Sequence, residues 1–579
     1  MKLSEAMKQG YAKRLKIFVG KALAEPPEKI PTGAGGVLHF CLGTPEMRER
    51  AEKVIQRTAN WFTECPIKSA GVPRSPQGEC DFAANRLARM LVSGTQGLSE
   101  KTRNMLESFF LENNFESHYK SENHMLIFHV SRYAAARYYS DKLFRAYGKT
   151  GAELAIEDKA YLTEFLQFRG RHGWAEFDST GYTGEDMAAL LLLYDCAEEP
   201  LKTLARMSLD QLLLDMLADS MGSFYCGAHG RIYEGDALNF LSAEMVSVYS
   251  LYFGGPYFGF GSGIDNMQAD IAMTGYMPSD YVFAAAAEKP VRYENFEAAQ
   301  LHSISREAPQ RQLVQEKGHI SKYVYITPDY ALGGVCFQDE YENPEAAWYA
   351  HHQQHEWELT FAHDTEARVF THHPGAHGTE GAEHGYWTGD LECCCGAFYS
   401  NKNKALAMYD IPEGEEHEIN ANILFELYEI KEDGSYIFLK YENAYAMLYF
   451  SEGYYHKAGK YENRELRSKG KKHAVVCEAG TKEEHGSFDG FISYIKQKPI
   501  MFDKQKMSLE YDNMYMDKTA RRLNGRAVCF PFPLFKNPFM FSELGSGIIK
   551  VKTSLGETTL DFNNITITTG RSAEGENKC

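Results

Sequence analysis

The spacing of apolar residues changes near the middle of the chain, and this change limits the possible folds more than any other feature. Before about residue 300, apolar residues recur every three or four positions, as on one face of a helix; one such series is Met187, Leu190, Leu191 and Tyr194. After residue 318 the chain consists of short β-rich runs separated by turn signals, among them "SKYVYIT" and "SYIFLKY". Strands that follow one another without helices between them pair antiparallel. We therefore expect an α+β multidomain protein with a helical domain at 1–300, a connector at 301–318, an antiparallel β-sandwich at 319–568 and a flexible tail at 569–579.

Charge and cysteine content exclude several classes of partner. The net charge of −18 over 579 residues argues against nucleic acid and against anionic membrane surfaces. An acidic substrate would therefore need a local pocket of positive or donor groups. The 12 cysteines form neither a secretory disulfide framework nor paired zinc-finger motifs. The N-terminal segment has no apolar core of a signal peptide, and no apolar run is long enough to span a membrane. We expect a cytoplasmic protein, and the sequence leaves open whether it forms a homo-oligomer.

The stretch "YKSENHMLIFHVSRYAAARYY" places Glu122, Asn123 and His124 side by side at the start of a predicted helix, with Arg132 further along roughly the same face. Each residue taken singly is explained by a polar helix terminus. Together they offer amide, imidazole and guanidinium donors, a combination suited to a carboxylate ligand.

A second candidate is Tyr182 in "RHGWAEFDSTGYTGEDMAALLLLYD". Thr183 followed by Asp186 resembles a capping box, which puts Tyr182 next to a helix N-terminus. The partial positive charge there favours a phenolate that can act as a base. The alternative is a hydrophobic staple, in which Tyr182 packs on Met187.

A third candidate is the turn "GAHGRIYEGDALNF", where His229, Arg231 and Tyr233 alternate between glycines that permit close approach of a ligand. A solvated loop explains this pattern nearly as well.

Histidines are concentrated in residues 351–384, which contain eight of the chain's 20: His351, His352, His355, His363, His372, His373, His377 and His384. Imidazoles at this density indicate either a catalytic rim or a site for a divalent cation such as zinc, manganese or calcium. No HExxH-type pair fixes a ligand set, so the identity of any metal ligands stays unknown.

Together these features resemble the heparinase II/III-like polysaccharide lyases. In that family an (α/α) toroid of helical hairpins precedes an antiparallel β-sandwich, and a sugar chain lies between them. Asn123 and His124 are similar to the family's Asn-His pair, and Tyr182 to its catalytic tyrosine. His355 in "HEWELTF" is similar to the histidine of the family's sandwich domain. Trp357 stands where the family has an aspartate, so His351 or His352 could replace His355.

The resemblance implies β-elimination on a glycan containing uronic acid, with glycosaminoglycan as the first choice of substrate. Asn123 and His124 would neutralise the carboxylate, while Tyr182 and His355 would serve as base and acid. No cofactor is required. The residues expected to bind substrate are Glu122, Arg231, Tyr233, His352 and Trp387.

Two alternatives remain. A glycoside hydrolase on the same scaffold would use two carboxylates, and four surround Tyr182: Glu176, Asp178, Glu185 and Asp186. A carbohydrate-binding protein without catalytic activity would have the same architecture.

Overall fold

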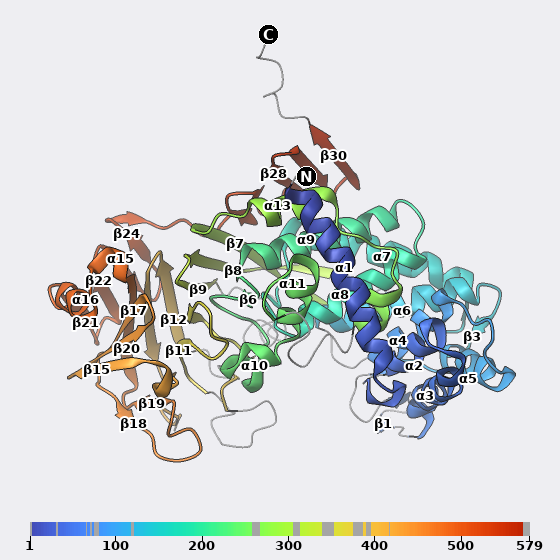
Figure 1. Ribbon diagram of the computed structural model, residues 1–579, viewed down its shortest axis with the longest axis horizontal. Helices are drawn as coiled ribbons and strands as arrows, with labels where there is room; N and C mark the ends of the chain where they lie inside the picture. Colours follow the sequence, from blue (N-terminus) through green and yellow to red (C-terminus); the bar gives the residue numbers. More distant parts are fainter. Residues whose placement is uncertain are drawn as a thin grey trace, which may run out of the picture.

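The computed structural model describes residues 3–30, 33–64, 67–69, 72–74, 80–116, 121–257, 267–304, 313–338, 353–374, 386–388, 395–415 and 417–570. Helices make up most of the first half of the chain and antiparallel sheets most of the second (Figure 1). The predicted fold class is therefore confirmed.

In the helical part, most helices pack against helices that are close to them in the sequence. Helix α6 packs against α4, α7 and α8, while α1 contacts α11 and α13 at the other end of the helical sequence. The first and last helices therefore lie together, as a toroid requires. The helices are α1 Leu3–Ala24, α2 Ala34–Leu42, α3 Pro45–Glu64, α4 Cys80–Ser93, α5 Glu100–Glu112, α6 Glu122–Tyr138, α7 Gly151–His172, α8 Tyr182–Cys196, α9 Leu201–Ala218, α10 Glu234–Leu238, α11 Glu244–Phe253, α12 Gln268–Met273 and α13 Asp280–Glu288.

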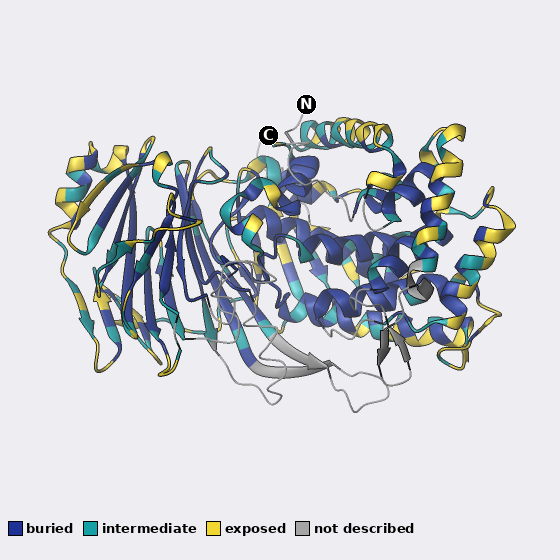
Figure 2. Cartoon of the chain, turned by 90° about the horizontal axis from the view of Figure 1, so that it is seen from below, coloured by how far each residue is buried: buried dark blue, intermediate teal, exposed yellow. Residues whose placement is uncertain are grey.

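Helices α6, α8 and α9 are buried along almost their whole length. In the helical part, buried residues gather in the interior and exposed residues lie along the outer edge (Figure 2). A helix that is apolar on all sides is stable only inside a core, and α8 carries the run Leu190–Leu193, which is fully buried. None of the described helices combines the length and apolar character needed to cross a membrane.

Three short hairpins interrupt the helices, although no strand was predicted before residue 300. They pair β1 Ile67–Ser69 with β2 Val72–Arg74, β3 Leu143–Phe144 with β4 Lys149–Thr150, and β5 Ser220–Met221 with β6 Phe224–Tyr225. Runs of two or three residues are too short to show an alternating pattern.

The sheet part contains one large sheet and two smaller ones, all antiparallel. The 13-stranded sheet has the order β18-β19-β14-β11-β10-β9-β8-β7-β26-β27-β28-β29-β30. Its strands are β7 Tyr293–Ile304, β8 Leu313–Ile326, β9 Tyr330–Gln338, β10 Trp357–Phe361, β11 Arg368–His372, β14 Ile419–Asn422, β18 Tyr455–His456, β19 Glu465–Ser468, β26 Phe535–Lys536, β27 Met540–Ser542, β28 Ile548–Thr553, β29 Gly556–Asp561 and β30 Thr566–Gly570.

The two smaller sheets have six and five strands. The six-stranded sheet contains β12 Gly396–Asn401, β13 Lys404–Asp410, β15 Glu429–Asp433, β16 Tyr436–Tyr441, β17 Ala444–Phe450 and β20 Lys472–Thr481. The five-stranded sheet contains β21 Ile500–Asp503, β22 Ser508–Tyr511, β23 Met514–Asp517, β24 Arg521–Leu523 and β25 Arg526–Ala527, and helices α15 Lys482–His485 and α16 Phe488–Ile495 precede it.

The side chains of β13 point alternately to the two faces of the six-stranded sheet, and this explains how the three sheets stack. Ala405 and Ala407 face a core shared with the large sheet, whereas Leu406 and Met408 face a second core formed with the five-stranded sheet and α16. Because successive side chains of a strand point to opposite faces, one strand contributes to both cores. The middle sheet is therefore covered on both faces.

The change from helix to sheet occurs earlier than predicted. Strand β7 begins at Tyr293, and residues 301–304 and 313–318 of the expected connector belong to the β7–β8 hairpin. Likewise, the predicted tail begins at 569, but β30 continues to Gly570.

The helical and sheet parts share one hydrophobic core. Val324 and Ile326 of β8, together with Ile549 and Val551 of β28, are packed with the residues of the helices. A side-chain carbon added at Gly170 of α7 would lie 2.1 Å from the ring of Phe562, so helix and sheet are in direct contact there. This continuous packing fixes the loops at the junction.

Candidate active site

Three predicted residues meet at the junction of the helical and sheet parts. The hydroxyl groups of Tyr182 and Tyr233 are hydrogen-bonded at 2.6 Å. Arg231 Nη2 donates to the Tyr182 hydroxyl at 3.3 Å, and its guanidinium carbon lies 4.6 Å from the centre of the Tyr182 ring. Both tyrosines are half-buried. The arrangement places a phenol directly beside a permanent positive charge.

Glu176 connects this group to Asn123. Arg231 Nη1 donates to Glu176 Oε1 at 2.7 Å, and Asn123 Nδ2 donates to Glu176 Oε2 at 2.6 Å. Asn123 is fully buried. The carboxylate that Asn123 holds in this structure is therefore that of Glu176, and the amide orients the partner of Arg231. We call Asn123, Glu176, Tyr182, Arg231 and Tyr233 the tyrosine–arginine site.

Glu122 holds the loop that carries Glu176 in place. Its Oε2 accepts a hydrogen bond of 2.8 Å from the backbone N–H of Glu176, and its Oε1 is paired with Arg169 of α7. Burial lowers the pKa of Arg169 to about 9, against the opposing effect of Asp186 and Glu176. Glu122 is thus a structural anchor of the loop that carries Glu176, and it does not line the site.

The sheet part reaches the site through Gln353. Arg231 Nε donates to Gln353 Oε1 at 3.1 Å, and the backbone N–H of Ile232 donates to the carbonyl of Gln353 at 2.9 Å. Arg231 and Gln353 have φ values of 52° and 56°, in the left-handed region that residues other than glycine rarely adopt. Such strain persists only where the surrounding contacts enforce it, and it is frequent at functional sites.

Helix α8 begins at Tyr182 itself, and the predicted capping box does not form. The backbone N–H of Tyr182 donates to Ser179 Oγ at 3.1 Å, and Gly181 occupies the N-cap position. Burial raises the pKa of Tyr182 well above its usual value, although the Arg231 guanidinium opposes this shift. Desolvation therefore outweighs the helix terminus that was expected to favour a phenolate, and the phenol is protonated at neutral pH.

His124 follows Asn123 in the first turn of α6 and is held by two residues of α4. Its Nδ1 is 2.7 Å from Asp81 Oδ2 on α4, and its ring packs against Phe82. A carboxylate on Nδ1 holds the proton there and leaves Nε2 as the basic nitrogen.

His355 and Trp387 lie in the sheet part behind the site. The backbones of His229 and His355 form an antiparallel bridge, so this segment is continuous with the turn that carries Arg231. The imidazole of His355 is fully buried, with Nε2 at 2.9 Å from the carbonyl oxygen of Trp387. Trp387 is also fully buried. Both side chains are thus enclosed in this arrangement, and His351 and His352 lie outside the described residues.

His229 does not provide a charged group. Burial lowers its pKa to about 3, and its Nδ1 is 3.1 Å from the carbonyl oxygen of Asp178. Its role is to join the turn that carries Arg231 to the loop before Tyr182.

Asp178 ties that same loop to the sheet. Lys322 Nζ of β8 lies 2.6 Å from Asp178, 2.8 Å from Asp219 and 2.9 Å from Glu297. Asp178 has a positive φ of 43° two residues after Glu176. The buried ion pair therefore fixes a strained turn between Glu176 and Ser179.

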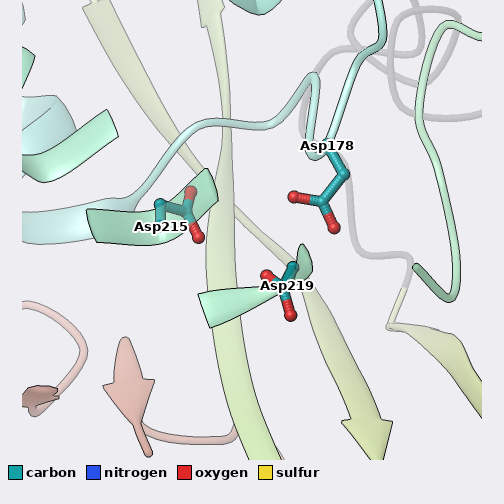
Figure 3. A group of neighbouring side chains, drawn as sticks. All are labelled: Asp178, Asp215 and Asp219. Carbon is teal, nitrogen blue, oxygen red and sulfur yellow. The ribbon is translucent and has the colours of Figure 1, made fainter. Parts of the chain in front are cut away.

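Among the described residues, the one group close enough to hold a metal ion is Asp178, Asp215 and Asp219, whose carboxylates face one another (Figure 3). The Lys322 ammonium already contacts two of them, Asp178 and Asp219, and we assign no metal there. Of the eight histidines in 351–384, His355, His372 and His373 are buried and His363 is exposed, while the other four lie outside the described residues. The predicted cation near these histidines thus stays a prediction.

Three of the four carboxylates of the hydrolase alternative are committed to other contacts. Glu176 binds Arg231 and Asn123, Asp178 binds Lys322, and Glu185 is paired with Arg86 at 3.3 Å. Asp186 is buried, and burial together with the nearby Glu176 raises its pKa well above the usual value. A hydrolase needs an acid and a base on opposite sides of an accessible bond, and these side chains do not provide such a pair.

Comparisons with known proteins give weak likenesses. No family model matches the chain, and no curated protein does. Among solved structures it is similar to a Streptomyces coelicolor A3 chondroitin AC lyase mutant, with 9% identity, a TM-score of 0.33 and coverage of 96% of this chain and 92% of that one. It is also similar to a Paenibacillus xanthan lyase, with 9% identity, a TM-score of 0.31 and coverage of 89% and 66%. At these scores the overlap identifies neither a substrate nor a catalytic residue.

Proposed function

We propose that the protein is a polysaccharide lyase that cleaves a uronate-containing glycan by β-elimination, as its sequence resemblance to the heparinase II/III-like enzymes implies. Glycosaminoglycans are the first substrates to test. The observation that carries the proposal is the half-buried phenol of Tyr182, bonded to Tyr233 at 2.6 Å and to Arg231 at 3.3 Å. A protonated phenol beside a guanidinium matches two needs of the reaction, a proton for the leaving oxygen and a positive charge for the carboxylate.

In the elimination, a base removes the proton from C5 of the uronate, the bond from C4 to the glycosidic oxygen breaks, and a C4–C5 double bond forms. The glycosidic oxygen leaves with a proton, which Tyr182 supplies. Burial keeps the Tyr182 phenol protonated until that moment, and the hydroxyl of Tyr233 is placed to return a proton to it. General acid catalysis of this kind is worth about 10²–10⁴-fold in rate.

Negative charge grows on the uronate carboxylate as the C5 proton leaves, and Arg231 is assigned to stabilise it. Nη1 of Arg231 is held by Glu176, whereas Nη2 lies on the side of Tyr182. A carboxylate bound along the Nη2 edge would lie next to the proton donor. In this scheme Asn123 and Glu176 are positioning residues, since they fix the plane of the guanidinium.

His124 is the base in this proposal. Asp81 on its Nδ1 leaves Nε2 as the basic nitrogen, and His124 lies next to Asn123 in sequence, in the first turn of α6. His355 is not given the proton-transfer role expected from the sequence, because its ring is enclosed.

A screen of uronate polymers tests the proposal. Elimination yields an unsaturated sugar that absorbs in the near ultraviolet, so the wild-type protein should raise this absorbance with at least one acidic polymer. New reducing ends without that absorbance would favour the hydrolase. Saturable binding of a polymer without cleavage would favour the carbohydrate-binding alternative.

A further inference from the structure

A cavity lies at the junction of the helical and sheet parts, away from the tyrosine–arginine site. It measures about 600 Å³ and is enclosed by the β5–β6 hairpin, Tyr249 of α11 and the end of α13 on the helical side. The turn after β8 and residues 362–363 enclose it on the sheet side. None of its lining residues belongs to the tyrosine–arginine site. This volume is within the usual range for small-molecule sites.

The wall of this cavity is mostly apolar in character. Met221, Phe224 and Ile326 contribute carbon surface, and the rings of Phe224 and Tyr257 pack at a tilt of 35° with their centres 5.1 Å apart. Two hydroxyl groups of the wall are used within the protein: Ser220 Oγ donates to the Met216 carbonyl at 2.6 Å, and Thr327 Oγ1 donates to the Tyr330 carbonyl at 2.7 Å. The cavity therefore suits a ligand with an apolar body.

Lys289 is a cation in this wall without an acidic partner. Its Nζ donates to the carbonyl of Leu217 at 2.7 Å and to that of Ser220. Within the part of the chain that the structure describes, no carboxylate lies within ion-pair distance of it. Burial lowers the pKa of Lys289 to about 8, against the opposing influence of Cys226 and Asp219. Buried charges in proteins are ordinarily paired, and two carbonyl groups do not neutralise an ammonium.

We propose that this cavity binds a small monocarboxylate with an apolar, ring-sized body, whose carboxylate accepts a hydrogen bond from Lys289. An ammonium has three donors, and the two carbonyls occupy two of them. One cation balances the single charge of a carboxylate but not the charge of about −1.5 to −2 on a phosphate group. His363, which also lines the cavity, is exposed and lies on the opposite, sheet side.

Isothermal titration calorimetry with the full-length protein tests this proposal. The probe is 3-phenylpropionate, and its neutral amide is the matched control because it has the same body without the charge. The wild-type protein should bind the acid more tightly than the amide by about ten- to hundredfold, the usual contribution of a hydrogen bond to a charged group. Equal binding of acid and amide, or no binding of either at millimolar concentration, would overturn the proposal.

Two variants locate the binding. Lys289→Met keeps the apolar stem and removes the charge, so it should weaken binding of the acid to the level of the amide. Ala286→Phe fills the cavity from α13 and should abolish binding of both compounds while Lys289 is kept. If both folded variants bind the acid as the wild-type protein does, the ligand sits elsewhere and the assignment is wrong. Glucuronate as a third probe distinguishes the apolar ligand proposed here from an acidic sugar, which should bind at least tenfold more weakly.

Discussion

Tyr182 and Tyr233, which are 51 residues apart in the sequence, share a hydrogen bond of 2.6 Å between their hydroxyl groups. One is the first residue of α8, and the other lies just before α10. Arg231 makes contact with Tyr182 from the same turn as Tyr233, so two segments of the helical part build one donor group. The proposed chemistry depends on this pair.

Replacing Tyr182 with Phe should lower kcat by about 10²–10⁴-fold on a cleaved polymer, because the leaving oxygen loses its proton donor. KM should change little, since the ring is kept. Tyr194→Phe on the same helix is the matched control: it removes a hydroxyl that accepts from Arg206 at 2.7 Å, away from the site. Steady-state kinetics of both variants check the prediction, and a Tyr182→Phe enzyme with the wild-type kcat would remove Tyr182 from the mechanism.

Replacing Arg231 with Met should destabilise the fold by about 3–5 kcal/mol, because the buried Glu176 carboxylate loses its counter-charge. Adding Glu176→Gln should recover much of this loss, since a neutral amide needs no partner cation. Urea unfolding of the two single variants and the double variant measures the coupling. Additive effects would show that Arg231 and Glu176 do not depend on one another. Activity should stay low in all three, because the guanidinium or its orientation is lost.

Replacing Asp81 with Asn should reduce kcat by about tenfold or more, because the amide no longer selects the Nδ1–H tautomer of His124. The fold should be retained, since the amide can still make one hydrogen bond to the ring. The pH dependence of kcat separates a catalytic role from a structural one. A change in the basicity of His124 moves the acid limb of the profile, whereas a structural defect lowers the whole curve without moving it.

The contribution of Asp215 to the stability of the protein should fall as pH rises from about 4 to about 7. Burial, together with the nearby Asp178 and Asp219, raises the pKa of Asp215 from 3.8 to about 7. Since the folded state holds this proton more tightly than the unfolded state, the stabilisation is complete below pH 3.8 and is lost as pH rises through about 7. Asp215→Asn lacks this titration. Its stability relative to wild type should therefore increase by at most about 3 kcal/mol between pH values of about 5 and about 8.

Urea unfolding at both pH values measures this difference, and the exposed Asp489→Asn is the control. A difference between Asp215→Asn and wild type that does not vary with pH would show that Asp215 is already ionised in the fold.

Part of the site could be predicted from the sequence, namely the residues that belong to a recognisable motif within a short stretch of chain. Asn123, Tyr182, Arg231 and Tyr233 stand in polar stretches between or at the start of helices, and the structure brings all four together. The partners of these residues carry no such signal: Gln353 meets Arg231 across 122 positions, and Asp81 meets His124 across 43. Contacts of this kind arise from tertiary packing, which spacing along the chain does not encode.

Because tertiary contacts cannot be deduced from spacing along the chain, the sequence also led to wrong expectations for several residues. His355 and Trp387 lie in a stretch rich in polar residues, yet both are fully buried. Glu122 was expected to bind substrate, but its partner is Arg169 of α7. A charged or aromatic side chain near a candidate site can equally be an internal support, and only the fold distinguishes the two.

Isotope analysis of the cleavage products tests the central claim most directly. A uronate polymer is digested in water labelled with heavy oxygen, and the fragments are examined by mass spectrometry. Our account predicts an unsaturated fragment without solvent oxygen, formed at least about a hundredfold more slowly by the Tyr182→Phe protein. Incorporation of solvent oxygen into saturated fragments would contradict it.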